Sequence, residues 1–342
     1  MLDLHGVYEI INEFRVPTRK LVNVDEGTGQ EALKSLSVRF WYENLRKRTG
    51  LYSAYGLEQY FEPDSFRRDP NDSISQYRNK WIRYEDGMHR PQSELLKLVE
   101  KKCPGSARDL DHPLWRVLDA RDLKVLRGDQ FLRTLGPGVQ SAIFTPEGDS
   151  PFAQSARMPV NHVVLNRLQR KANLDALACL IWLLRESVQL NTAMTDRISV
   201  ALHRVLIMMT MDLQALRVGR SLVTLVLDNI LRLPMAAHQR LALSAEQYLE
   251  ASVRLNALVY RTPHCQGKSL TWSQRTKVMG DMLDFKYGFD IFFAMGRPFL
   301  INAEAPGLSE SQRALAVHEE KRWRWGWDCL RRNRQGDAAE LE

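Results

Sequence analysis

The sequence predicts an all-α protein organised as two helical domains. Across most of its 342 residues, large apolar side chains recur at steps of three and four, which is the period of an amphipathic helix. Several of these apolar runs are preceded by a Ser or Thr with a Gln three residues later, the spacing of a capping box. Strand patterns are weak throughout, and no repeat of fixed period is present. We therefore expect helices packed on helices.

For the first half of the chain, the sequence predicts a series of short helices. Apolar spacing indicates one helix over residues 30–48 and a shorter one over 53–61. Residues 62–72 are polar and contain two prolines, so we predict a loop there. Asp111 has the side chain and the position of an N-cap for a further helix that starts at Pro113.

The second half predicts a helical bundle behind a linker. Residues 136–159 hold the richest run of Gly and Pro, so we predict a linker between a domain over 1–135 and a domain over 160–336. The second domain is expected to contain about five to seven helices and to serve oligomerisation or partner binding. Three capping-box pairs predict helix starts: Ser244 with Gln247, Thr271 with Gln274, and Ser309 with Gln312.

The stretch over residues 73–99 is the most informative part of the chain. Ser73 and Gln76 have the capping-box spacing, which predicts a helix over 74–86. Four large apolar groups would share one face of it: Ile74, Tyr77, Trp81 and Tyr84. We expect Trp81 to be a core residue of the first domain.

The opposite face of this predicted helix carries the side-chain types that contact DNA. Its members are Gln76, Arg78, Asn79, Lys80 and Arg83, with Arg90 just beyond. Arg and Lys hydrogen-bond guanine, Asn and Gln hydrogen-bond adenine, and all of them reach phosphates. A short helix with one packed face and one such face fits the major groove. The alternative is an ordinary amphipathic helix whose polar face is only solvated.

The residues at the end of this predicted helix match a pattern known from a protein family. The run Glu85-Asp86-Gly87-Met88-His89-Arg90-Pro91 fits the Glu-x-Gly-x-x-x-Pro pattern that ends a recognition helix. Residues 73–105 therefore resemble the Cro/phage-repressor (XRE-type) helix-turn-helix family. The family's preceding Ala-x-x-x-Gly is missing, and residues 62–72 are longer than its tight turn. The resemblance implies a helix-turn-helix-like unit with base-reading residues at 75–83. It also implies a homodimer, since family members bind two half-sites.

Charge is concentrated in two patches. The net charge is +7, which is compatible with a nucleic-acid partner. Residues 73–108 hold eight Lys and Arg against four Asp and Glu, a balance of +4. Residues 313–334 hold seven against three, again +4.

The second patch interleaves basic and aromatic residues from Lys321 to Trp327. Arg and Trp together suit phosphates and stacked bases, and they are also enriched at protein interfaces. We predict a secondary nucleic-acid or partner contact here, with Trp325 left outside the core. Its residues are Arg324, Trp325, Arg331, Arg332 and Arg334. The alternative is that Trp323 and Trp327 pack inward while the arginines are merely solvated.

Signatures of catalysis are missing from the sequence. There is no phosphate-binding Gly-x-x-x-x-Gly-Lys, no Gly-x-Gly-x-x-Gly and no Gly-x-Ser-x-Gly. The four cysteines lie far apart, so no zinc or redox pair is indicated. Asp281, Asp284 and Asp290 near Lys286 suggest a nuclease site as an alternative, but carboxylates scattered on a helix are usually solvated. We predict no catalytic residue, no cofactor and no metal.

These observations together predict a DNA-binding protein of bacterial or mobile-element type that is not an enzyme. The alternative is a structural or adaptor subunit of a larger bacterial nucleoprotein assembly, for phage defence or transposition, contacting protein or RNA. The start of the chain lacks a signal-peptide pattern, and charged residues interrupt the apolar runs, so we expect a reduced, cytoplasmic protein without a membrane partner.

Overall fold

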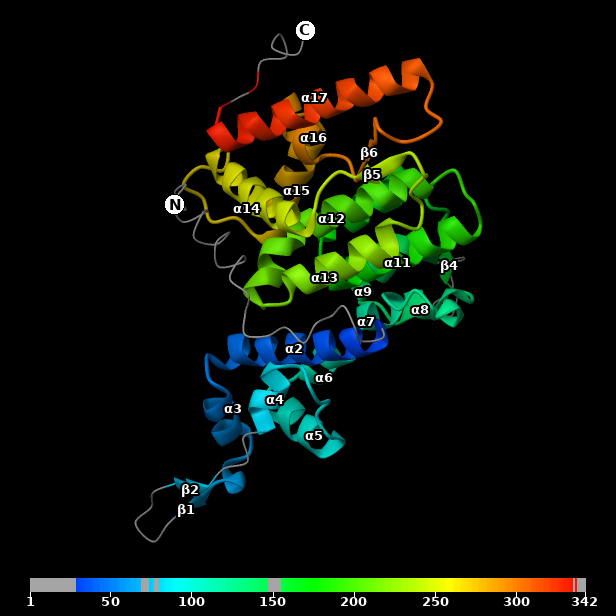
Figure 1. The fold of residues 1–342 in the computed structure, drawn as a ribbon. Helices are drawn as coiled ribbons and strands as arrows, with labels where there is room; N and C mark the ends of the chain where they lie inside the picture. The colour runs from blue at the N-terminus through cyan, green and yellow to red at the C-terminus, as the bar shows by residue number, and fades with distance from the viewer. Residues whose placement is uncertain (1–28, 69–73, 77–79, 147–154, 335, 337–342) are drawn as a thin grey trace.

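A computed structural model describes residues 29–68, 74–76, 80–146, 155–334 and 336. These residues are mostly helical, and their strands form three two-stranded antiparallel ribbons. The all-α class predicted from the sequence is therefore confirmed. Figure 1 shows a large helical body with a smaller group of helices, α2 to α6, at one end.

The elements and their bounds in chain order are α2 (Gly29–Thr49), α3 (Ala54–Phe61), η1 (Pro63–Ser65), β1 (Arg67–Arg68), β2 (Ile74–Gln76), α4 (Lys80–Glu85), α5 (Ser93–Lys102), α6 (Ser106–Leu110), α7 (Pro113–Val117), η2 (Leu123–Leu126), α8 (Gln130–Arg133), α9 (Pro137–Ile143), β3 (Phe144–Pro146), β4 (Ser155–Arg157), α10 (His162–Lys171), α11 (Leu174–Gln189), α12 (Thr195–Ala215), α13 (Gly219–Val226), η3 (Leu227–Leu231), β5 (Gln239–Leu241), α14 (Ala245–Arg261), α15 (Trp272–Leu283), α16 (Phe289–Met295), β6 (Phe299–Ile301) and α17 (Glu310–Arg332). β1 pairs with β2, β3 with β4, and β5 with β6.

The centre of the large body is α12, which packs against α10, α11, α13, α14 and α15. It is long and apolar enough to cross a membrane by composition, but 72% of its apolar window is buried inside the protein. His203 on this helix is fully buried and hydrogen-bonds the Tyr248 hydroxyl at 2.6 Å and the Met295 carbonyl at 3.0 Å. Burial lowers the pKa of His203 to about 3, so it is a neutral core residue.

The three capping boxes expected in the second half are all confirmed. At Ser244, Thr271 and Ser309 the side-chain oxygen accepts from the backbone N–H three residues on. The Gln at that third position returns a bond to the cap's own backbone N–H in each case. Local chemistry thus fixes the starts of α14, α15 and α17, because both orphan N–H groups find partners within four residues.

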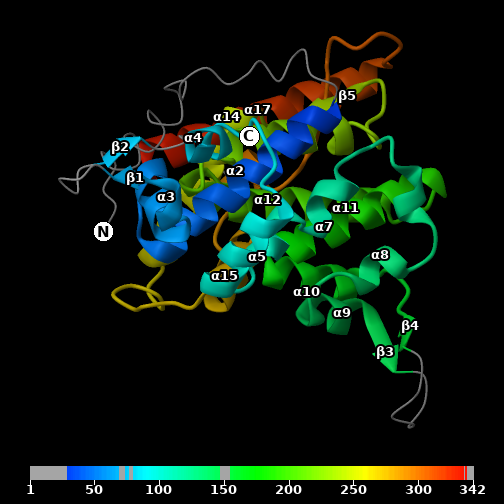
Figure 2. The ribbon, with the colours of Figure 1, turned by 90° about the horizontal axis from the view of Figure 1, so that it is seen from below.

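A smaller core lies beneath α2 and belongs to α3, α4, α5 and α6. α2 serves both cores, because Leu33, Leu36 and Phe40 face the large one while Trp41 and Leu45 face the small one. Seen from below in Figure 2, α2, α3, α4 and α5 lie in front of the bundle helices. The small group of helices is thus joined to the body through α2, whose Leu33, Leu36 and Phe40 lie in the large core.

The region predicted as a linker is only partly irregular. Residues 137–143 form α9, and its Val139, Ala142 and Ile143 are buried in the large core. The Pro-Gly pair that suggested a loop places Pro137 in the first helical turn, where its missing N–H is harmless.

The segment before α9 also packs on the large body. Trp182 of α11 donates to the Val125 carbonyl at 2.8 Å, and Arg185 donates to the carbonyls of Val117, Ala120 and Asp122. The two hydrophobic cores therefore divide near residue 110, ahead of the boundary expected at 136–159. Whether the chain separates into two independently folding domains stays a prediction.

Candidate nucleic-acid interface

The short helix α4 is held by aromatic packing. Trp81 is fully buried, stacked on Phe61 with ring centroids 5.4 Å apart and on Trp41 at 5.8 Å. Tyr84, one turn later, meets the edges of Trp41 and Trp81. The prediction that Trp81 is a core residue is confirmed. Because Trp81 and Tyr84 occupy the inner face, residues between them point toward solvent.

Glu62 fixes the start of α4. One of its carboxylate oxygens accepts a hydrogen bond from the Trp81 indole N–H at 2.9 Å, and the other pairs with the Lys80 ammonium. A carboxylate at a helix N-terminus also interacts favourably with the helix dipole. Glu62 therefore orients Trp81 while it neutralises the first cation of the helix.

The end of α4 depends on Gly87. This residue has φ +69°, in the left-handed region that glycine adopts readily, and the Met88 N–H donates to the Arg83 carbonyl at 2.8 Å. A Cβ on Gly87 would lie 2.5 Å from the Ser35 hydroxyl and 2.6 Å from the Ser35 carbonyl oxygen. The Gly of the Glu-x-Gly-x-x-x-Pro pattern is therefore required both by its backbone angle and by the close approach of α2.

The predicted helix over 74–86 is wrong in its first half. Residues 74–76 form β2, paired with Arg67 and Arg68 of β1, and the helix begins only at Lys80. The sequence between the strands, 69–73, is Asp-Pro-Asn-Asp-Ser, a composition that favours a turn. The loop predicted over 62–72 accordingly contains η1 and β1. Because these elements separate α3 from α4, the tight helix-turn-helix is not confirmed.

The six predicted DNA-contacting residues differ in whether the structure describes their side chains and in whether those side chains are exposed or paired. Arg78 and Asn79 lie outside the described residues, and Gln76 is described only as backbone of β2. Lys80 is half-buried in its pair with Glu62. Arg83 is exposed on α4. Arg90 is exposed but pairs with Asp111 at 2.6 Å.

The lysines of α5 belong to the basic segment 73–108 indicated by the sequence, but they were not singled out as DNA contacts. Lys97 and Lys101 are exposed on α5, one turn apart, and the neighbouring Lys102 lies over the Tyr60 ring at 4.8 Å. The β1–β2 ribbon projects beyond the helices in Figure 1 and contains Arg67 and Arg68, which are described there as backbone only. The step of four between the two lysines was a readable signal, whereas the strand pairing was not.

Glu85 connects α4 to the bundle. Its carboxylate lies 3.3 Å from a guanidinium nitrogen of Arg217, just beyond the end of α12, and the same nitrogen lies 3.7 Å from Glu43. Burial raises the pKa of Glu43, against the opposing charges of Arg46 and Arg217. The Glu of the family pattern therefore has a structural partner here and is turned away from the polar face of α4.

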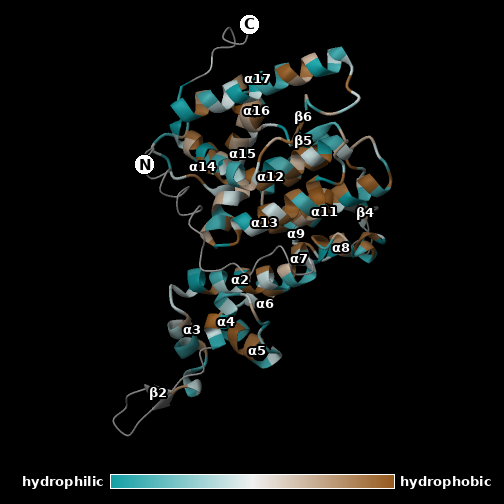
Figure 3. Cartoon of the chain, in the orientation of Figure 1, coloured by the Kyte–Doolittle hydropathy of each residue, from teal (hydrophilic) through white to brown (hydrophobic). Residues whose placement is uncertain are grey.

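The arginines predicted at the C-terminus are paired with carboxylates. Arg331 donates two hydrogen bonds to Glu250 of α14, both 3.1 Å. Arg332 and Arg334 share Asp328 at 2.9 and 3.5 Å, and Arg324 pairs with Glu320 at 2.9 Å. Figure 3 shows polar and apolar residues alternating along α17. These arginines are therefore engaged in ion pairs, but Glu320 and Asp328 already count in the segment's balance of +4, so only Glu250 of α14 offsets part of it.

The tryptophans of α17 combine features of the two alternatives, a partner contact with Trp325 outside the core and a helix that packs Trp323 and Trp327 inward. Trp327 is buried and Trp323 packs against the large core. Trp325 is half-buried and meets the Phe293 ring at 6.2 Å, so it is neither a core residue nor fully outside. Figure 1 shows α17 and α4 at opposite ends of the molecule. The structure therefore does not bring the two predicted contact regions together.

Comparison with known proteins found no relative. No protein-family model, no curated protein and no solved structure matches this chain.

Proposed function

We propose that this protein binds duplex DNA through the N-terminal helical unit, without catalysing a reaction. The observation that carries the proposal is the two-sided arrangement of α4. Its aromatic side is internal to the small core, whereas Arg83 is exposed opposite Trp81 and Tyr84. The helix then ends in the left-handed Gly87 and a buried Pro91. That layout is similar to the end of a recognition helix in the XRE-type family.

Charge around α4 supports the same proposal. Arg83, Lys97 and Lys101 are exposed, and we expect them to contact phosphates, which supply most of the affinity of a DNA-binding protein. Arg78, Asn79 and Gln76 remain the candidates for reading base edges. Members of the XRE-type family bind two half-sites as dimers. A homodimer on DNA is therefore part of the proposal.

The test is duplex binding measured over a range of salt concentrations. The triple variant Arg83→Ala, Lys97→Ala, Lys101→Ala should bind more weakly, and its slope of log affinity against log salt should be shallower by up to about 0.9 for each phosphate that is no longer neutralised. The matched control is Arg167→Ala, Arg197→Ala, Lys277→Ala, which removes the same charge from exposed positions of the bundle. An equal reduction of affinity in both variants would refute a DNA site at α4.

A second candidate function rests on apolar exposure around the same helix. Ile82, next to Arg83, is 44% exposed, and Met88, just beyond the end of α4, is 58% exposed. Exposed apolar groups beside an arginine are typical of protein interfaces. This favours an adaptor subunit of a larger bacterial nucleoprotein assembly, for phage defence or transposition, with protein or RNA as the partner. Binding that survives high salt and is abolished in Ile82→Ser, Met88→Ser would select this candidate over DNA.

A further inference from the structure

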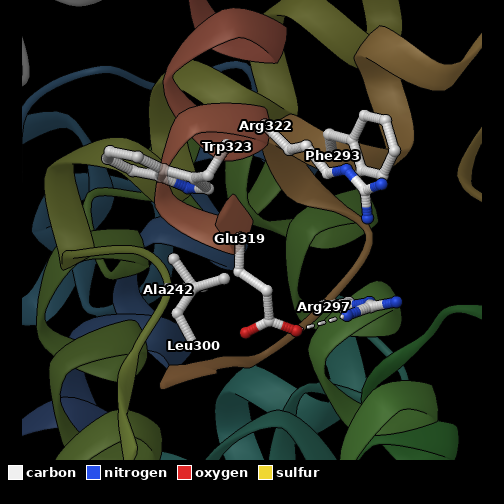
Figure 4. A pocket seen from close by; sticks show the side chains of 7 residues that line it. All are labelled: Ala242, Phe293, Arg297, Leu300, Glu319, Arg322 and Trp323. Atoms are coloured by element: carbon white, nitrogen blue, oxygen red, sulfur yellow. Dashed lines mark hydrogen bonds and ion pairs between the residues drawn. The ribbon is translucent and has the colours of Figure 1, made fainter. Parts of the chain in front are cut away.

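A small pocket lies at the other end of the molecule from α4, between α16, α17 and the β5–β6 ribbon. Its volume is about 30 Å³. The lining residues are Ala242, Phe293, Arg297, Leu300, Glu319, Arg322 and Trp323 (Figure 4). Ala242 and Leu300 are buried and give it an apolar side. Figure 4 shows the side chains of Arg297 and Arg322 on the same side of the pocket as Phe293.

The two guanidinium groups are held on neighbouring aromatic rings. Arg322 lies over Phe293 with its guanidinium carbon 5.3 Å from the ring centroid, and Arg297 lies over Phe292 at 5.2 Å. The two rings are themselves 5.9 Å apart. Stacking on an aromatic face fixes the plane of an arginine, which reduces the entropy cost when its N–H groups bind a ligand.

Arg322 differs from its neighbours on α17 in having no carboxylate partner. Arg324, Arg331 and Arg332 each pair with a carboxylate, whereas no carboxylate pairs with Arg322 within the described part of the chain. Its Nε is buried and has no hydrogen-bond acceptor among those residues. The positive charge of Arg322 is therefore not compensated by an ion pair among the described residues.

The charges of the pocket indicate which anion it suits. Arg297 donates to Glu319 at 3.0 Å, so one of the two positive charges is already compensated. The remaining charge is +1, which matches a carboxylate monoanion. Phosphate carries more than one negative charge near neutral pH and would leave an excess beside Glu319.

We propose that this pocket binds a carboxylate attached to an apolar group. The carboxylate accepts from the terminal guanidinium N–H groups of Arg322 and Arg297, as a bidentate acceptor does with guanidinium groups. A volume of about 30 Å³ holds little more than the carboxylate itself. The apolar group therefore extends out of the pocket, and we assign it to the ring of Phe289, which is 50% exposed and stacked on the pocket residue Phe293 at 6.1 Å. This site is independent of the proposed DNA binding.

The test uses the intact chain and four probes, with binding followed by saturation-transfer NMR and tryptophan emission. Phenylacetate represents a free aromatic acid, and an N-acetylated Phe-Asp amide represents an acidic peptide. Either should bind more tightly than acetate, which lacks the apolar group, and than inorganic phosphate. The tighter of the two identifies the source of the carboxylate.

Three variants locate the site. Arg322→Gln should weaken phenylacetate binding by about tenfold or more, because it removes a charge-assisted pair. Arg322→Lys keeps the charge but not the guanidinium group, so its affinity should lie between those of the parent and Arg322→Gln. The matched control Arg324→Gln removes one charge from the same helix at a side chain that is 74% exposed, and it should bind as the parent does. Arg322→Gln loses the stacking on Phe293 but no ion pair of the described chain, so its melting temperature should fall only slightly.

Three results would overturn the proposal. The first is no saturable binding of phenylacetate or the peptide at millimolar concentrations. The second is equal binding by Arg322→Gln and the parent protein. The third is phosphate binding as tight as that of phenylacetate, which would describe an unselective cationic surface instead of a carboxylate site.

Discussion

Replacing Gly87 with alanine should destabilise the protein in two separable ways. The φ of +69° is unfavourable for any residue with a Cβ, by about 1–2 kcal/mol. The new Cβ would also meet the Ser35 carbonyl oxygen at 2.6 Å, and a backbone atom of α2 cannot rotate away. Overpacking of this kind costs about 1–3 kcal/mol. We therefore expect the free energy of unfolding to fall by about 2–5 kcal/mol in total.

Gly50 provides the control for the backbone contribution. It ends α2 with φ +71°, almost the same angle, but a Cβ there would meet nothing within 4 Å. Gly50→Ala should thus show only the conformational part, about 1–2 kcal/mol. Urea unfolding followed by circular dichroism gives both free energies, and their difference reports the contact between α4 and α2. Equal destabilisation of the two variants would refute the close approach of Ser35 to Gly87.

Three further perturbations test the fold. Trp81→Ala should destabilise by about 3–5 kcal/mol in the same assay, because the emptied site is enclosed by aromatic rings; a change below about 1 kcal/mol would show that α4 is not held there. Arg331→Ala should lower the melting temperature more than Arg332→Ala, because Glu250 is only 16% exposed whereas the Arg332 pair is largely solvated; equal shifts would contradict this. Burial alone would raise the pKa of Asp175, but His112, the Gly136 N–H and Arg108 outweigh it and lower that pKa. The resulting stability is present above the ordinary Asp pKa of about 4 and disappears as the pH falls through the lower folded value, so Asp175→Asn should show a smaller acid-induced destabilisation than the parent.

The helix starts that were predicted correctly depend on residues close together in the sequence. Ser244, Thr271 and Ser309 each complete a reciprocal pair within four residues, so sequence spacing contains the whole interaction. Ser73 and Gln76 have the same spacing, yet the chain around Gln76 is a strand. The pairing of β2 with β1 is a contact between separate segments, and it overrides the local preference.

The pocket on α17 illustrates what sequence patterns leave out. Arg322 was predicted only as part of a basic and aromatic run, and the sequence of that run does not show which of its cations has an ion-pair partner. Packing distinguishes them, because Glu320, Asp328 and Glu250 reach some arginines and not others. Arg297 comes from the turn between α16 and β6, and no spacing rule relates it to Arg322.

The position of Glu85 limits how α4 can act if it binds DNA. Its pair with Arg217 joins α4 to the end of α12, and Arg39 of α2 donates to the Asp86 carbonyl at 3.2 Å. Both contacts lie at the C-terminal end of the helix, whereas Glu62 holds its N-terminal end. With both ends fastened, α4 cannot shift toward a groove without moving α2 and the bundle. Contact with DNA must therefore be made by a preformed surface, and its specificity must come from side chains beside Arg83.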